Sequence, residues 1–377
     1  MQTIKGTTIL SHSLLNEIDV LYANLSMQEE HKRLVPMTFD KSVKGIVDMF
    51  EYYTDVKRNF KYVKEDIKPL NLPEYDKKNI IVCFSGGKDS FAVARHYQKL
   101  HYNVYLYHLK GLNATYCGEY SEHLTAERVA EYLGLPLVVE EISYSGYHQW
   151  VEHPMKNMIM ATRALSWGIR RGITTRVAVG TFSSAFVEDN AFDVCGGDCV
   201  EMWKAYDKVI RRIIPKYHTY IPNKNYLDSF KVIEKEPKAL ELLMSCMTPT
   251  RFRRAFRERT ESRYKINLLP KRCGCCWKDC AEYIWFADKG LLPLNRNYYI
   301  HCLEVLANTK AKEDGIRFFS VRALWSEYFL DYPIEESILY DEIQDAIIQA
   351  KGKVVCADNI VKRQVPCSAI LDSGHIS

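Results

Sequence analysis

A short loop between an apolar run and a helical pattern carries two adjacent glycines together with hydroxyl and charged side chains. It reads Ser85-Gly86-Gly87-Lys88-Asp89-Ser90. Adjacent glycines permit positive φ angles and let backbone N–H groups approach an anion closely. The helix that follows presents unpaired N–H donors and the positive end of its dipole. Because Lys88 can offset phosphate charge and Asp89 can hold Mg²⁺ or orient the loop, we predict a phosphate site with these two as catalytic residues.

A glycine-rich turn without a ligand is the alternative interpretation of this loop. Two glycines alone would favour that alternative, whereas all six residues directly after a buried strand favour phosphate binding. The loop is not a Walker A motif, because no Gly-Lys-Ser or Gly-Lys-Thr triplet follows a four-residue spacer.

Cysteines form the second group of residues that could do chemistry. Four of the twelve fall within eight residues, namely Cys273, Cys275, Cys276 and Cys280. Structural zinc takes four ligands, and a Cys-x-x-Cys turn supplies two of them. We predict Cys246, Cys273, Cys276 and Cys280 as Zn²⁺ ligands, with the choice among the clustered four left open. Unliganded cysteines and a catalytic, sulfur-carrying cysteine are the alternatives.

Apolar runs alternate with helical patterns over residues 79–214 and must position both groups. The runs typical of buried strands are 80–84, 104–109, 137–142 and 177–180. The helical patterns are 90–100, 122–133, 155–171 and 199–214. This alternation predicts an α/β fold with a doubly wound parallel sheet, in which ligands bind at the carboxyl ends of the strands.

The chain is predicted to divide into three parts. Residues 1–76 form a mostly helical N-terminal extension, with helices expected at 9–25 and 42–53. Residues 77–290 form the α/β domain and include the cysteine cluster, with further helices at 236–244 and 250–263. Residues 291–377 form a mostly helical C-terminal extension, with helices expected near 321–328 and 335–350.

Composition narrows the class of protein. The 377 residues are 47% hydrophobic and carry a net charge of only +4, which does not by itself indicate a polyanionic partner. No signal-peptide core or apolar stretch of membrane-spanning length is present, so we expect a cytoplasmic protein without a membrane partner. An arginine-rich stretch, 251–263, is interleaved with Glu258 and Glu261, so we expect a solvated or phosphate-facing helix and no nucleic acid partner.

The hexapeptide resembles the PP-loop of the N-type ATP pyrophosphatases, and the order of the other motifs resembles one branch, the 7-cyano-7-deazaguanine synthases (QueC). The resemblance spans about residues 79–285. The further motifs are Pro154-Met155-Lys156-Asn157, Val179-Gly180-Thr181, the segment 192–199, Ser245-Cys246 and Cys273-Gly274-Cys275-Cys276. Lys156 stands where that family has Arg, the segment 192–199 is longer, and the last cysteine is one residue late.

The resemblance implies the cofactors ATP, Mg²⁺ and Zn²⁺ and a ligase that adenylates a carboxylate, that of 7-carboxy-7-deazaguanine. Asp193 and Asp198 are candidates to bind this purine-like substrate. In the family, ammonia converts the acid to an amide and then to a nitrile. The implied ATP-binding residues are Ser85, Gly86, Gly87, Lys88, Asp89, Ser90, Lys156, Asn157 and Gly180.

Three other functions stay open. Enlarged relatives in anti-phage defence systems look suited to join a deazaguanine acid to a protein amine, and the two extensions fit that role as docking surfaces. A sulfur-transfer PP-loop enzyme, similar to a tRNA thiolase or a phosphosulfate reductase, would use a cysteine as nucleophile. A non-catalytic nucleotide-binding partner in a complex is the third. A homodimer is also left open.

Overall fold

The structure, a computed structural model, describes most of the α/β region and parts of both extensions. The described residues are 3–6, 15, 18, 21, 38–54, 60–110, 122–141, 156–181, 200–223, 227–244, 250–308 and 336–345. The predicted helix 321–328 lies outside them, as does the predicted helix 9–25 apart from three residues. The statements below concern the described residues.

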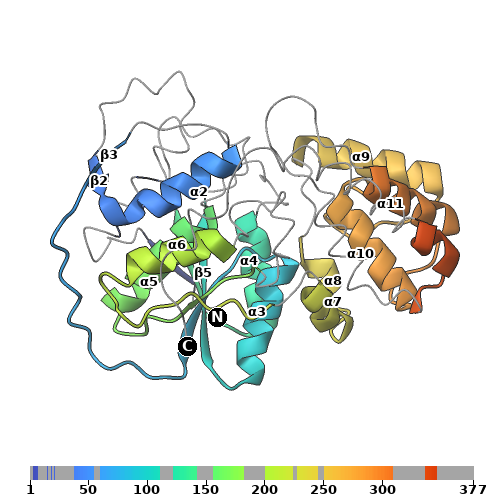
Figure 1. Cartoon of the computed structure of the whole chain (residues 1–377). Helices are drawn as coiled ribbons and strands as arrows, with labels where there is room; N and C mark the ends of the chain where they lie inside the picture. Colours follow the sequence, from blue (N-terminus) through green and yellow to red (C-terminus); the bar gives the residue numbers. More distant parts are fainter. Residues whose placement is uncertain are drawn as a thin grey trace.

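A parallel sheet organises the described part of the chain (Figure 1). It has five strands in the order β1-β6-β5-β4-β7, and all neighbours run parallel. The strands are β1 (Thr3–Gly6), β4 (Asn79–Cys83), β5 (Asn103–Lys110), β6 (Leu137–Glu141) and β7 (Val177–Ala178). A separate parallel pair consists of β2 (Thr38–Asp40) and β3 (Lys61–Val63).

Helices cover both faces of the sheet. The helices α3 (Lys88–Lys99), α4 (Glu122–Leu133), α7 (Leu227–Glu234) and α8 (Ala239–Leu242) contribute to the core on one face. The helices α2 (Lys44–Thr54), which follows the short helix η2 (Lys41–Val43), α5 (Lys156–Arg170) and α6 (Val200–Ile210) cover the other. This mixed α/β arrangement is compatible with the doubly wound fold predicted from the sequence.

Strand β4 separates the two cores. Ile80 and Val82 pack into the core with α3 and α4, whereas Ile81 and Cys83 pack into the core with α5 and α6. All four are buried, as expected for a parallel strand with helices on both sides. The continuous apolar run at 80–84 was therefore a sound basis for predicting a central strand.

The strand order places a topological switch point beside β4. The chain moves from β4 through β5 to β6, then crosses back to β7 on the opposite side of β4. In open α/β sheets, ligands bind outside the carboxyl ends of the strands at such a point. The loop after β4 and the residues after β7 meet there.

Two short segments extend the sheet at its edges. Thr3–Gly6 pairs in parallel with β6, so the N-terminal segment contributes an edge strand. On the other side, Tyr220 bridges Ala178 in parallel and exchanges backbone hydrogen bonds with Val177 and Val179.

Three helices after α8 form the end of the molecule shown in yellow to orange in Figure 1. They are α9 (Thr250–Tyr264), α10 (Trp277–Asp288) and α11 (Arg296–Asn308). Trp285 and Phe286 of α10 pack on Phe230 of α7, with ring centroids 5.9 and 5.5 Å apart. Through these rings the three helices share a core with the sheet.

Candidate functional site

The loop Ser85–Ser90 lies between the carboxyl end of β4 and the start of α3, and Gly86 has no room for a side chain. Its φ is +75°, and an added Cβ would lie 2.7 Å from the backbone nitrogen of Ala126 in α4. Both the conformation and the space therefore require glycine. The backbone of the loop is pressed against α4.

Gly180 fixes the other side of the loop. A Cβ at Gly180 would lie 2.8 Å from the backbone nitrogen of Ser90. Gly180 follows β7, so its close approach brings the end of that strand against the first turn of α3. The structure thus brings Gly180 to the loop, and its role in ATP binding stays a prediction.

Two hydroxyl groups hold the loop in shape. The Oγ of Ser85 accepts a hydrogen bond from the N–H of Gly87 at 3.3 Å, and it lies 3.3 Å from the Oγ of Ser90. The Oγ of Ser90 donates to the carbonyl of Gly87 at 3.1 Å. The N-cap of α3 is Gly87, and no side chain caps this helix. The helix N-terminus is therefore left to its backbone donors, which suits an anion.

Lys88 is almost fully buried and turns toward α7. Its Nζ donates to Asp89 at 2.5 Å and to the Oγ of Ser229 at 3.2 Å, and it lies 5.3 Å from the centre of the Phe230 ring. Burial lowers the pKa of Lys88 against the opposing effect of Asp89, and the charge of Lys278 lowers it further. Since Lys278 belongs to α10, the cysteine-bearing helix reaches the neighbourhood of the loop.

His108 anchors the residue before the loop. Its Nδ1 lies 2.8 Å from the carbonyl oxygen of Phe84, and the imidazole is buried. Burial lowers the pKa of His108 to about 4, although the hydrogen bond to Phe84 acts in the opposite direction. A neutral ring that donates from Nδ1 fits this position.

The cysteine turn begins at Cys273 and ends where α10 starts. The Sγ of Cys273 accepts hydrogen bonds from the N–H groups of Cys275 at 3.5 Å and Cys276 at 3.3 Å. Gly274 has a φ of +73°, and Cys276 is the N-cap residue of α10. This turn directs two sulfur atoms to one side, and the helix N-terminus favours negative charge there.

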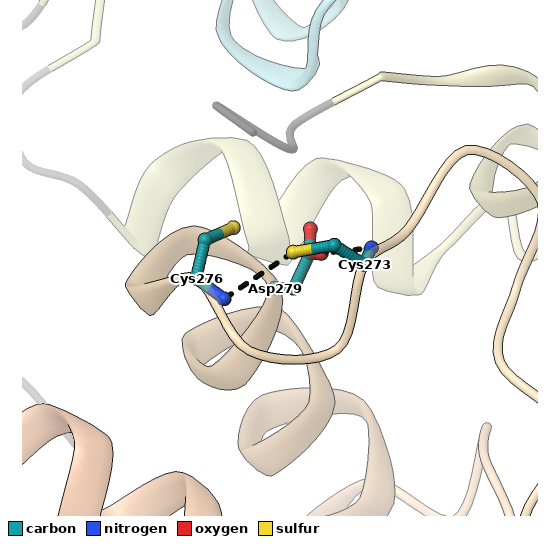
Figure 2. A group of neighbouring side chains, drawn as sticks. All are labelled: Cys273, Cys276 and Asp279. Carbon is teal, nitrogen blue, oxygen red and sulfur yellow. Dashed lines mark hydrogen bonds between the residues drawn. The ribbon is translucent and has the colours of Figure 1, made fainter. Parts of the chain in front are cut away.

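The carboxylate of Asp279 lies beside the sulfur atoms of Cys273 and Cys276 (Figure 2). The ligand atoms of Cys273, Cys276 and Asp279 all lie within 4.8 Å of one another, so this cluster could hold a metal ion. One Asp279 oxygen, Oδ2, accepts from the N–H groups of Cys273 at 2.7 Å and Gly274 at 3.1 Å. Burial, followed by the charge of Cys273, raises the pKa of Asp279 to about 8.

Neighbouring helices brace the turn. Thr260 of α9 donates to the carbonyl of Cys273 at 3.3 Å, and the hydroxyl of Tyr298 in α11 donates to the carbonyl of Gly274 at 3.0 Å. The residue predicted as the last thiolate, Cys280, is fully buried near Cys302 of α11. It is not a member of the cluster of ligand atoms.

Two cations connect the cysteine turn with the loop. Lys271 donates to the carbonyl of Leu242 at 2.7 Å, and Arg272 donates to the carbonyl of Leu243 at 2.7 Å. These carbonyls belong to the end of α8, where helix carbonyls lack intrahelical partners. The next carbonyl, that of Met244, would lie 3.2 Å from a Cβ at Gly87. The segment 242–244 therefore lies between the two sites.

The remaining predicted site residues divide into two groups. Lys156 and Asn157 begin α5, whose N-terminus follows the β6 strand end by a connection outside the described residues. Asp193, Asp198 and Cys246 themselves lie outside the described residues.

Two buried ion pairs were not predicted from the sequence. Glu140 of β6 pairs with Arg163 of α5 and accepts from the hydroxyl of Tyr107. Near the cysteine turn, Arg272 pairs with Glu282, and both side chains are about 95% buried. Single charged residues within apolar patterns were the available signal, and their partners are distant in the sequence.

Comparisons with known proteins leave the family open. No family model matches the chain, and no curated protein matches it. One similar solved structure is that of a predicted subunit of a tRNA methyltransferase from Methanocaldococcus jannaschii, which is 19% identical. That match covers 52% of this chain and 94% of the other, with a TM-score of 0.30.

Among the described residues, no helix has the length and apolar character to cross a membrane.

Proposed function

We propose that this chain is an ATP-dependent ligase that splits ATP into AMP and pyrophosphate at the loop Ser85–Ser90. The observation that supports it most is the pair of glycine contacts at the switch point. Gly86 and Gly180 approach α4 and Ser90 so closely that a methyl group at either would overlap backbone atoms. Such contacts fix the loop backbone against the start of α3, where unpaired N–H groups favour an anion.

In the proposed reaction, a substrate carboxylate oxygen attacks the α-phosphorus of ATP, and the bond to the β-phosphate oxygen breaks. The products are an acyl-adenylate and pyrophosphate. An amine then attacks the acyl carbon, AMP leaves with the bonding electron pair, and a proton is lost from the amine. The loop N–H groups hold the pyrophosphate, and Lys88 opposes its charge. Mg²⁺ bound with ATP would supply further charge neutralisation, with Asp89 as its candidate ligand.

The metal-binding part of the proposal concerns Zn²⁺ at the cysteine turn. Two thiolates and a carboxylate within 4.8 Å are donors that zinc accepts. Zinc there would close the turn and hold the start of α10. Lys278 in this helix lowers the pKa of Lys88. Cys246 remains a prediction as a further ligand, whereas Cys280 lies outside this cluster of ligand atoms.

The substrate and nucleophile are the finer part of the proposal. The motif order supports a purine-like acid, 7-carboxy-7-deazaguanine, with Asp193 and Asp198 binding its ring donors. Ammonia would give an amide; a second ATP would then adenylate the amide oxygen, and loss of AMP and two protons would leave a nitrile. A protein amine would instead give a conjugate. Mass spectrometry after incubation with ATP, Mg²⁺ and the acid, with and without ammonium, distinguishes these outcomes.

The direct test of ATP cleavage compares two lysines of the same helix. We expect Lys88→Met to reduce release of AMP and pyrophosphate at least 100-fold, because it removes the buried cation of the loop. Lys99→Met, at the exposed end of α3, should leave the rate within about twofold. Equal rates for the two variants would reject the role of Lys88. Absence of AMP release from the wild-type protein with any acid and amine would favour the non-catalytic alternative.

Sulfur transfer is tested at the cysteines. Stoichiometric zinc that resists chelators, together with cysteines that do not react with alkylating agents, would exclude a cysteine nucleophile. Rapid alkylation of one thiol with loss of product would instead support it.

A further inference from the structure

The donor set of the cysteine turn can be specified further than the metal site itself. Two adjacent residues, Asp279 and Cys280, compete for the position that follows Cys273 and Cys276. Neighbouring residues on an α-helix point about 100° apart, since 3.6 residues make one turn. Only one of the two can therefore face the turn. The inference rests on the metal-binding part of the proposed function and is independent of the ATP chemistry.

Cys280 faces the next helix. Its side chain is fully buried and lies beside Cys302. Cys302 belongs to α11, which packs along α10. Together with Ala281, Ile284 and Trp285, Cys280 belongs to the apolar core. A thiol in this position serves as a small core side chain.

Asp279 faces the turn, but only one of its two carboxylate oxygens accepts hydrogen bonds from it. Oδ2 accepts the two N–H bonds from Cys273 and Gly274. Oδ1 is buried and has no hydrogen-bond partner among the described residues. The nearest cation, the Nε of Arg272, is 4.0 Å from Oδ1, which is too far for a hydrogen bond. A carboxylate that only braced the turn would not need to bury its second oxygen unsatisfied.

We propose that Asp279, and not Cys280, is the protein ligand that follows Cys273 and Cys276, so that the metal has a mixed sulfur and oxygen donor set. The three residues are spaced three apart, with Cys276 at the N-cap and Asp279 in the first turn of α10. Because residues three apart lie on one side of a helix, Cys276 and Asp279 point the same way, and the turn at Gly274 brings Cys273 beside them. The two N–H bonds to Oδ2 orient the carboxylate, as outer hydrogen bonds do for metal ligands.

Cobalt substitution of the full-length protein tests the donor set, because sulfur-to-cobalt charge-transfer absorption increases with each bound thiolate. Zinc affinity is measured in parallel by competition with a chromogenic chelator. We expect Cys280→Ala to leave both the absorption and the zinc affinity unchanged. Asp279→Asn should weaken zinc binding at least 10- to 100-fold with unchanged thiolate absorption. Asp279→Cys should add the absorption of one thiolate.

The Asp279→Cys variant keeps the test decisive if Asp279→Asn fails to fold, and circular dichroism monitors folding in each case. Loss of thiolate absorption in Cys280→Ala, with no gain in Asp279→Cys, would overturn the inference. A wild-type protein that binds neither zinc nor cobalt would overturn it together with the metal-binding part of the proposed function. A protein that binds metal with the expected spectra but releases no AMP would leave this inference standing and reject the ligase.

Discussion

The phosphate loop and the cysteine turn are constructed by opposite means. At the loop, backbone groups form the site. Glycines are required because a Cβ at Gly86 would lie within 3 Å of α4, and a Cβ at Gly180 within 3 Å of the first turn of α3. At the turn, side chains form the site, and its composition depends on which residue of α10 faces Cys273. The backbone site therefore depends on positions that carry no side chain. The side-chain site depends on which residues of α10 point toward Cys273.

This difference governs how each region tolerates change. The loop packs against α4, which the sheet holds in place, so an added methyl group cannot be accommodated without moving backbone atoms. The turn depends on buried charges, since Arg272 contacts Glu282 and the carbonyls at the end of α8. We therefore expect the largest losses of stability from charge removal near the turn and from added volume near the loop.

Arg272→Met should give the largest effect. Arg272 and Glu282 are both about 95% buried, and breaking a buried pair from one side costs about 3–5 kcal/mol. We expect that loss in the free energy of unfolding, measured with urea. The double variant Arg272→Met/Glu282→Met, which removes both charges, should recover at least half of it. A double variant as unstable as the single one would show that the contacts with Leu243, and not the charge on Glu282, carry the loss.

Gly86→Ala tests the loop against a matched glycine. Gly134 also has a positive φ, +68°, but no atom lies within 4 Å of its added Cβ. Strain of the left-handed conformation costs about 1–2 kcal/mol at either position. At Gly86, overpacking against α4 adds about 1–3 kcal/mol. Urea denaturation should therefore give a larger loss in the free energy of unfolding for Gly86→Ala than for Gly134→Ala. Equal losses would show that α4 shifts to accommodate the methyl group.

Acid titration tests the anchor of the loop. The pKa of His108 is about 4 in the folded protein, against an ordinary value of 6.5. Between these values the unfolded chain takes up a proton that the folded chain refuses. The His108 contribution is therefore full above pH 6.5 and is lost as the pH falls toward 4, by roughly 3 kcal/mol.

Unfolding free energies of the wild-type protein and His108→Asn, compared from pH 7 to pH 4, measure this loss. The amide nitrogen of Asn can replace the Nδ1 donor to Phe84 but does not titrate. The variant should therefore lose less stability with acid. Parallel curves for the two proteins would assign the acid sensitivity to other groups.

The sequence specified the loop better than the turn for a physical reason. The apolar run 80–84 and the pattern 122–133 agree with β4 and α4 because hydrophobic periodicity and flanking glycines are local signals. The edge strand Thr3–Gly6 was missed, since four residues of mixed polarity carry no periodic signal and are ordered by β6. The eight-residue helix α7 was missed for a similar reason.

At the turn, the cysteine spacing predicted Cys280 as a ligand, whereas the cluster of ligand atoms contains Asp279. Cys-x-x-Cys-x-x-Asp is readable in the sequence, but a carboxylate at that spacing is also an ordinary first-turn residue of a helix. Only the buried, unsatisfied Oδ1 and the position of Cys280 against Cys302 separate the two readings. The position of Cys280 depends on α11, a helix that the sequence pattern did not reveal.

The smallest expected effect comes from Arg254→Met on α9, which serves as the exposed counterpart of Arg272→Met. Arg254 pairs with Glu258 at 2.8 Å, one turn along the helix, and its side chain is 87% exposed. Such pairs contribute about 0.3–0.5 kcal/mol and weaken with salt. We expect a loss of that size in the free energy of unfolding at low salt, and none at about 1 M salt. A loss of several kcal/mol would mean that the arginines of α9 are not simply solvated. The contrast between buried and exposed arginines near the turn would then fail, and a bound partner on this face would have to be sought.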